Sequence, residues 1–110
     1  MEKITFQLPE KVNFAELLEV TEGNNLELTK STKRGSSGNI WYDVFCDLNT
    51  LGSLASLLSL FLYIKEKYGK KEVLRIEIPI NGGIAEKTID YLINYLTNLK
   101  NSLYDSNNQK

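Results

Sequence analysis

Three side chains that could take part in catalysis, Asp43, Cys46 and Asp47, lie close together in the sequence. The chain contains no histidine, so the commonest general base and metal ligand of enzymes is missing. Asp43 and Asp47 share one face of a predicted strand, where the strand rise separates them by about 13 Å, too far for a close carboxylate pair. Cys46 has no histidine to activate it, so we expect a buried thiol rather than a nucleophile.

A second candidate is the turn from Asn81 to Gly83, which falls between a predicted strand and a predicted helix. Backbone N–H groups at such a turn, together with the helix dipole, can bind an anion. No phosphate-binding glycine motif is present, however, and Glu86 in the first helical turn would repel a phosphate. We therefore expect a tight turn, and we keep as the alternative function a small ligand-binding or anion-binding protein, or a minor enzyme, that uses Asn81 to Gly83.

A third candidate is the predicted hairpin that carries positive charge and aromatic rings, namely Lys30, Lys33, Arg34, Trp41 and Tyr42. Such a hairpin could hold single-stranded nucleic acid through phosphate contacts and base stacking. The net charge of -1 supplies no field that would attract nucleic acid. The aromatic motifs of RNA-binding sheets are absent, so nucleic-acid binding is the weaker alternative.

The elements that must position these residues follow from the spacing of apolar side chains. Alternation predicts strands over 4–8, 26–29, 40–48 and 73–80. A helical period predicts helices over 13–22, 51–68 and 84–103. We expect Asn13 to cap the first helix, with Glu16 returning the bond, and Gly69 to end the second in the left-handed conformation. A glycine-rich loop at 33–39 and a turn at Lys70 and Lys71 connect the strands and helices.

This order predicts an α+β fold: a ferredoxin-like βαββαβ antiparallel sheet with an additional C-terminal helix. Residues 1–103 form a single domain, and residues 104–110 form a polar, flexible tail. Right-handed crossovers place the first two helices on one face of the sheet. The last helix has three open positions: on the other face, against the long helix, or against a second copy of itself.

The long helix is unusually apolar, because residues 48–64 carry no charge. Leu60, Leu62 and Tyr63 fall off its main apolar stripe, and a helix that is apolar all round is a buried helix. Either the domain or a partner must cover it. One side of this helix carries three small residues and a tyrosine, namely Gly52, Ser56, Ser59 and Tyr63. Small residues at this spacing predict close packing on the sheet, and the alternative is close packing on a second helix.

The last helix carries a heptad-like seam that favours a two-fold dimer. Tyr91 and Tyr95 lie one turn apart off this seam, and exposed tyrosines often anchor interfaces. The predicted protein interface consists of Tyr91, Tyr95, Ile89, Leu92, Leu96, Leu99 and Tyr63.

The stretch from Leu51 to Ile78 combines a helix rich in small residues, a turn of two lysines and a strand: LGSLASLLSLFLYIKEKYG, KK and EVLRIEI. It covers about a quarter of the chain and resembles the effector-associated constant component domains of bacterial conflict systems. This resemblance implies an adaptor that docks onto itself or a partner, not a catalyst. Small inhibitors carried by phages and mobile elements have a similar size.

The single cysteine excludes an intramolecular disulfide and fits a reducing cytoplasm. Residues 1–8 contain no apolar core of a signal peptide. The uncharged stretch is diluted by serines, so we expect no membrane span. The sequence thus predicts a non-enzymatic cytoplasmic adaptor or inhibitor that binds protein through apolar helix surfaces, self-associates as a homodimer, and uses no cofactor or metal.

Overall fold

Alternation along the first strand, β1 (Glu2–Pro9), decides which face of the sheet is buried. Ile4, Phe6 and Leu8 point to one side and belong to the core, whereas the side chains between them point to the other. The computed structural model describes residues 2–34, 38–69 and 74–108. Residues 35–37 of the predicted loop and the predicted turn at Lys70 and Lys71 lie outside these ranges.

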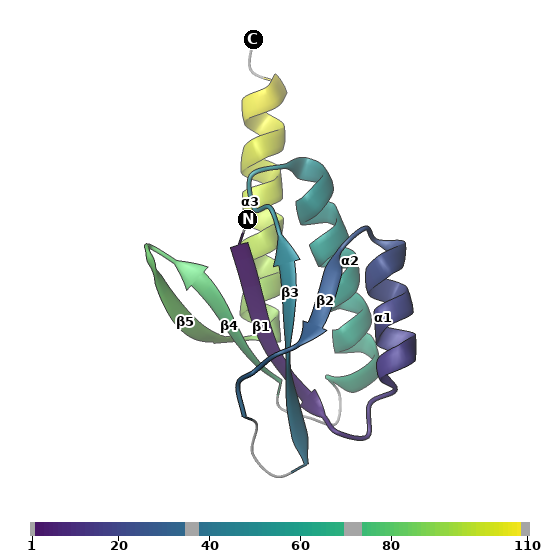
Figure 1. Cartoon of the computed structure of the whole chain (residues 1–110). Helices are drawn as coiled ribbons and strands as arrows, with labels where there is room; N and C mark the ends of the chain where they lie inside the picture. Colours follow the sequence, from purple (N-terminus) through teal and green to yellow (C-terminus); the bar gives the residue numbers. More distant parts are fainter. Residues whose placement is uncertain (1, 35–37, 70–73, 109–110) are drawn as a thin grey trace.

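The described part of the chain contains five strands and three helices. After β1 they run in the order α1 (Phe14–Gly23), β2 (Glu27–Lys30), β3 (Asn39–Cys46), α2 (Leu51–Tyr68), β4 (Arg75–Ile80), β5 (Gly83–Thr88) and α3 (Ile89–Asn108). The strands form one sheet in the order β2-β3-β1-β4-β5, and every neighbouring pair is antiparallel (Figure 1). The predicted α+β class is confirmed.

The fifth strand is a correction to the sequence analysis, which assigns residues 84–88 to the last helix. Asn81 and Gly82 have φ angles of 51° and 79°, and they form a two-residue turn between β4 and β5. A two-residue hairpin turn with two positive φ angles favours Asn-Gly because its twist matches that of the strands. Helix α3 therefore begins at Ile89 and runs to Asn108, which takes in most of the segment predicted to be a tail.

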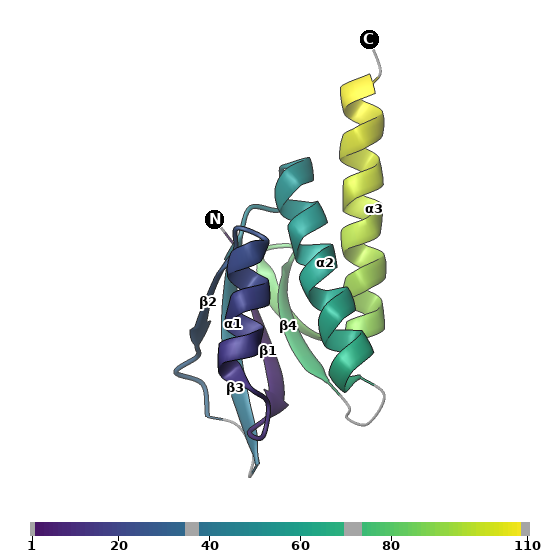
Figure 2. The same cartoon turned by 90° about the vertical axis from the view of Figure 1, so that its right-hand side faces the viewer.

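All three helices lie on the same face of the sheet (Figure 2). Of the three positions left open for the last helix, the structure shows the second: α3 packs beside α2, over β4 and β5. Ile89, Leu92 and Leu96 are buried in this contact, and Lys65 Nζ lies 2.6 Å from Asp90 Oδ1 across it.

The apolar helix α2 is covered by its own chain on three sides. Leu57, Leu60 and Phe61 are completely buried, and α2 lies over the sheet with α3 along one flank and α1 along the other (Figure 2). The outward side carries small residues such as Gly52 and Ser59, both exposed, so the predicted packing of these residues on the sheet is wrong. In the ranges that the structure describes, no helix is both long and apolar enough to cross a membrane.

The predicted ends of the first two helices lie within one residue of those observed, but not every predicted contact is present. Asn13 caps α1, where its side-chain oxygen accepts a hydrogen bond from Glu16 N at 3.2 Å. The carboxylate of Glu16 is engaged by α2 instead, because Tyr63 Oη donates to it at 2.7 Å and Lys67 pairs with it. Gly69 ends α2 in the right-handed conformation, with φ of -69°, so the predicted left-handed cap is wrong.

Cys46 lies in the core, as the strand parity predicts. Its side chain is 3% exposed and packs on the helix-covered face with Tyr42 and Val44. Burial raises the pKa of the Cys46 thiol to about 12, and the charges of Glu2 and Asp47 act in the same direction. The thiol therefore stays protonated at neutral pH, which argues against a role as nucleophile.

Replacing Gly82 by alanine should destabilise the β4–β5 hairpin. Its φ of 79° is costly for a residue with a Cβ atom, so we expect a loss of about 1 kcal/mol in the free energy of unfolding. Gly83→Ala is the matched control, because Gly83 has no such φ angle and has only Ile80 O, at 3.8 Å, near its added Cβ. Equal losses in the two variants, measured by urea denaturation, would contradict the turn described here.

Replacing Cys46 by alanine should cost about 1–2 kcal/mol at neutral pH through lost burial and a small cavity. In the wild type the folded state keeps the thiol proton, while the unfolded state loses it near pH 9. Above pH 9 the thiol's contribution to the free energy of unfolding of the wild type therefore falls by about 1.4 kcal/mol per pH unit. The difference in the free energy of unfolding between wild type and variant, measured by urea denaturation, should therefore narrow from pH 9 upward. An unchanged difference would show that the folded state does not hold the thiol in its protonated form.

Candidate functional site

The sheet face opposite the helices is polar, yet parts of it are buried. Thr5 Oγ1 donates a hydrogen bond of 2.7 Å to Asp43 Oδ1 between neighbouring strands, and both residues are buried. Asp47 lies beyond the end of β3, where its Oδ1 accepts from Asn49 N at 2.8 Å. The two aspartates thus serve separate structural contacts, and the structure does not bring them together as a catalytic pair.

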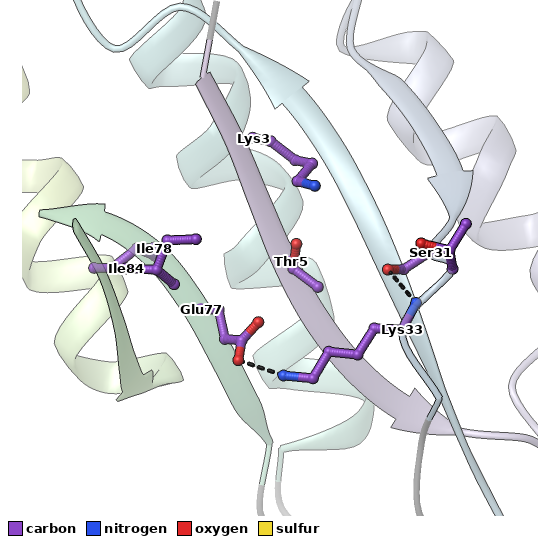
Figure 3. Close-up of a pocket in the computed structure, with 8 residues that line it drawn as sticks. Lys3, Thr5, Ser31, Lys33, Glu77, Ile78 and Ile84 are labelled. Carbon is purple, nitrogen blue, oxygen red and sulfur yellow. Dashed lines mark hydrogen bonds and ion pairs between the residues drawn. The ribbon is translucent and has the colours of Figure 1, made fainter. Parts of the chain in front are cut away.

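Lys33 forms a strap over this face. Its side chain extends from the loop after β2 across β1 and pairs with Glu77 on β4 (Figure 3). The same Nζ atom that pairs with Glu77 lies 4.0 Å from the centre of the Trp41 ring, and Trp41 is only 4% exposed. Trp41 is therefore not displayed for base stacking, which the hypothesis of nucleic-acid binding requires.

A cavity of about 210 Å³ opens on the same face beside this strap. It is lined by Lys3, Thr5, Ser31, Thr32, Lys33, Glu77, Ile78 and Ile84. Its central charges, Lys33 and Glu77, neutralise each other, and the Thr5 hydroxyl donates to Asp43. Among the described residues, no group of three or more histidine, cysteine, aspartate or glutamate side chains could hold a metal ion.

The turn from Asn81 to Gly83 does not lie at the start of a helix, so the sequence-based case for an anion site there is wrong. β5 separates the turn from α3, so the positive end of the helix dipole lies at Ile89 and not at the turn. Glu86, expected in the first helical turn, lies on β5, where Arg75 Nε donates to its Oε1 at 2.9 Å.

The predicted interface residues fall into two groups. The seam residues Ile89, Leu92 and Leu96 are buried within one chain, and Leu99 is half-buried beside them. Tyr63 faces α1 through its hydrogen bond to Glu16. These five side chains support the fold, and whether any of them also meets a partner stays a prediction.

Tyr91 and Tyr95 remain on the outer flank of α3. Their rings stack with centres 6.3 Å apart, and Tyr91 is 42% exposed. Asp90 faces α2 through Lys65, and Tyr91 follows it about 100° further round the helix. The tyrosines therefore lie on the flank turned away from α2, toward β5.

The edge of β5 lies against this flank. Lys87 Nζ on β5 lies 4.5 Å from the centre of the Tyr91 ring. Ile84, on the opposite face of β5, is 76% exposed. We call Ile84, Lys87, Tyr91 and Tyr95 the edge surface, because they flank the outer edge of the sheet from both sides.

A cavity of about 320 Å³ adjoins the edge surface. It is lined by Leu74, Arg75, Glu86, Lys87, Thr88 and Tyr91. Tyr91 and Tyr95 are recognisable in the sequence, whereas Ile84 and the strand edge are not, because the apolar spacing places both inside a predicted helix. The Asn81-Gly82 dipeptide after an alternating strand is the signal that predicts a second strand there.

Replacing Lys33 by alanine should uncover Trp41, the only tryptophan in the chain. We expect its fluorescence to shift to longer wavelength and to become easier to quench with acrylamide, with a loss of about 0.5–1 kcal/mol in stability. Lys30→Ala is the control, because Lys30 lies 5.1 Å from the Phe14 ring on the other face. Unchanged Trp41 emission in Lys33→Ala would show that the strap does not shield the ring.

No protein-family model, no curated protein and no solved structure matches the chain.

Proposed function

We propose that this protein is a non-enzymatic domain that binds protein through the edge surface, and that its first partner is a second copy of itself. The observation that carries the proposal is the exposure of Ile84 and Tyr91 on either side of a strand edge at the end of the sheet. Folded monomers seldom leave apolar side chains beside an open edge, because the edge recruits further strands.

The internal seam of α3 supports the choice of this surface. Leu92 and Leu96 are fully buried in the contact with the rest of the chain. Of the predicted interface residues of α3, Tyr91 and, in part, the half-buried Tyr95 therefore remain available to a partner on the outer flank. Tyrosine is common at such positions because its ring gives a large contact area and its hydroxyl tolerates water.

We further propose that the domain works as a cytoplasmic adaptor or inhibitor of the kind found in bacterial or phage conflict systems, as the resemblance of residues 51–78 implies. The order of the first four strands, β2-β3-β1-β4, supports a ferredoxin-like unit to which β5 and α3 are added. This arrangement would leave the added elements free to carry the partner-binding surface.

Two variants of α3 separate a role in the fold from a role in binding. Leu96→Asp places a charge in the core and should abolish the cooperative melting transition. Tyr91→Ala combined with Tyr95→Ala should leave the protein folded but weaken self-association by about 2 kcal/mol, as loss of interface tyrosines often does. Light scattering at about 10–100 µM, a range that detects micromolar affinities, measures the association.

Tyr104→Ala is the control for this experiment, because Tyr104 is an exposed tyrosine of the same helix outside the edge surface. It should leave self-association unchanged. A protein that is monomeric at every concentration would contradict self-association. A double tyrosine variant that fails to melt cooperatively, beside a Leu96→Asp variant that does, would show that the two faces of α3 are reversed.

A further inference from the structure

The two-residue turn determines which backbone groups of β5 point outward. In such a hairpin the residues that flank the turn, Ile80 and Gly83, form a hydrogen-bonded pair, and every second pair along the strands repeats this pattern. Ala85 and Lys87 therefore bond to β4. Ile84, Glu86 and Thr88 direct their N–H and C=O groups away from the sheet, where they can bond to another strand.

The two edges of the sheet differ in how well they are protected. β2 has four residues and is bounded by the charged side chains of Glu27 and Lys30. β5 has six residues, and its first half, Gly83 to Ala85, is uncharged. Short and charged edges resist pairing with other strands, and long uncharged ones favour it. Of the two edges, the β5 edge therefore favours pairing with an additional strand.

We propose that two copies of the protein pair through β5 in antiparallel orientation, around a two-fold axis at Ala85, so that one sheet runs through both. This inference rests on the proposed self-association and specifies its geometry. It combines the outward backbone groups of Ile84 and Glu86 with the side chains of the edge surface, and it is a form of strand addition.

Strand length, symmetry and charge together select the register. Within β5 (Gly83–Thr88), an axis at Ile84 or Lys87 would pair only three residues of each strand, whereas an axis at Ala85 or Glu86 pairs five. A two-fold axis perpendicular to the sheet keeps the helix-covered face of both copies on the same side. Residues directly opposite each other must then belong to the same face, and faces alternate along a strand. The axis must therefore pass between a residue and its own copy in the partner. An axis at Glu86 would place the two Glu86 carboxylates directly opposite each other, which is destabilising. An axis at Ala85 places each Glu86 opposite the partner's Ile84 instead.

The side chains of β5 fit the Ala85 register on both faces. On the open face the two Ile84 side chains become diagonal neighbours, about 7–8 Å apart at Cα, and can shield each other from water. On the helix face each Lys87, with Tyr91 beneath it, lies opposite Gly83, which has no side chain to obstruct it. Each Glu86 keeps its own counter-charge in Arg75.

Disulfide trapping tests the register. In the Ala85 register the two copies of residue 85 lie about 4.5 Å apart at Cα, within the range of a disulfide. Ala85→Cys in a Cys46→Ala background should form a covalent dimer under mild oxidation. Lys87→Cys in the same background is the control and should remain monomeric on a non-reducing gel, because its two copies are separated along the strands by four residues of rise, about 13 Å.

A proline variant tests the backbone pairing. Glu86→Pro removes one outward N–H group and leaves the bonds to β4 intact, so the protein should fold while its dimer dissociates at least about tenfold more readily. Glu86→Ala keeps the N–H group and should dimerise as the wild type does. If the proline variant loses its melting transition, the assignment of this N–H group as outward is wrong.

The outcomes separate this inference from the proposed function. A dimer that weakens in the double tyrosine variant but neither forms the Ala85→Cys disulfide nor responds to Glu86→Pro would overturn the strand pairing and leave the edge surface as the interface. A disulfide through Glu86→Cys in place of Ala85→Cys would overturn the register. A wild type that is monomeric at all concentrations would overturn both proposals.

Discussion

The need to cover α2 is the constraint on which the rest of this structure depends. The helix is apolar on most of its surface, and its buried side chains require cover on more than one side. The sheet, α1 and α3 supply that cover within a single chain. As a consequence, all three helices share one face of the sheet, and the apolar seam of α3 is used inside the domain.

The position of α3 explains the free strand edge. A helix beside α2 extends past β4, and the β4–β5 hairpin widens the sheet beneath it. The added strand buries part of α3 but becomes the new edge, with outward backbone groups and an exposed Ile84. The surface proposed for partner binding therefore results from the same elements that cover α2. On the opposite face of the sheet, the Lys33 side chain covers Trp41.

Much of the core could be predicted from the sequence, because it depends on local periodicity. The alternation of Ile4, Phe6 and Leu8 and the seam through Leu92 and Leu96 each identify the buried side of one element. The edge surface could not be predicted in full, because Ile84 and Ala85 extend the helical pattern of α3 backward and the Asn81-Gly82 turn overrides it. The strap from Lys33 to Glu77 joins residues 44 positions apart, and no local pattern indicates such a pair.

Amide hydrogen exchange at several protein concentrations tests the central claim most directly, because it observes the edge of β5 residue by residue. The amides of Ala85 and Lys87, bonded to β4, should be protected at every concentration. Those of Ile84 and Glu86 should exchange rapidly in dilute protein and slow down between about 10 and 500 µM, as the dimer forms. Exchange of Ile84 and Glu86 at the same rate throughout, in a protein that light scattering shows to be dimeric, would contradict pairing through this edge.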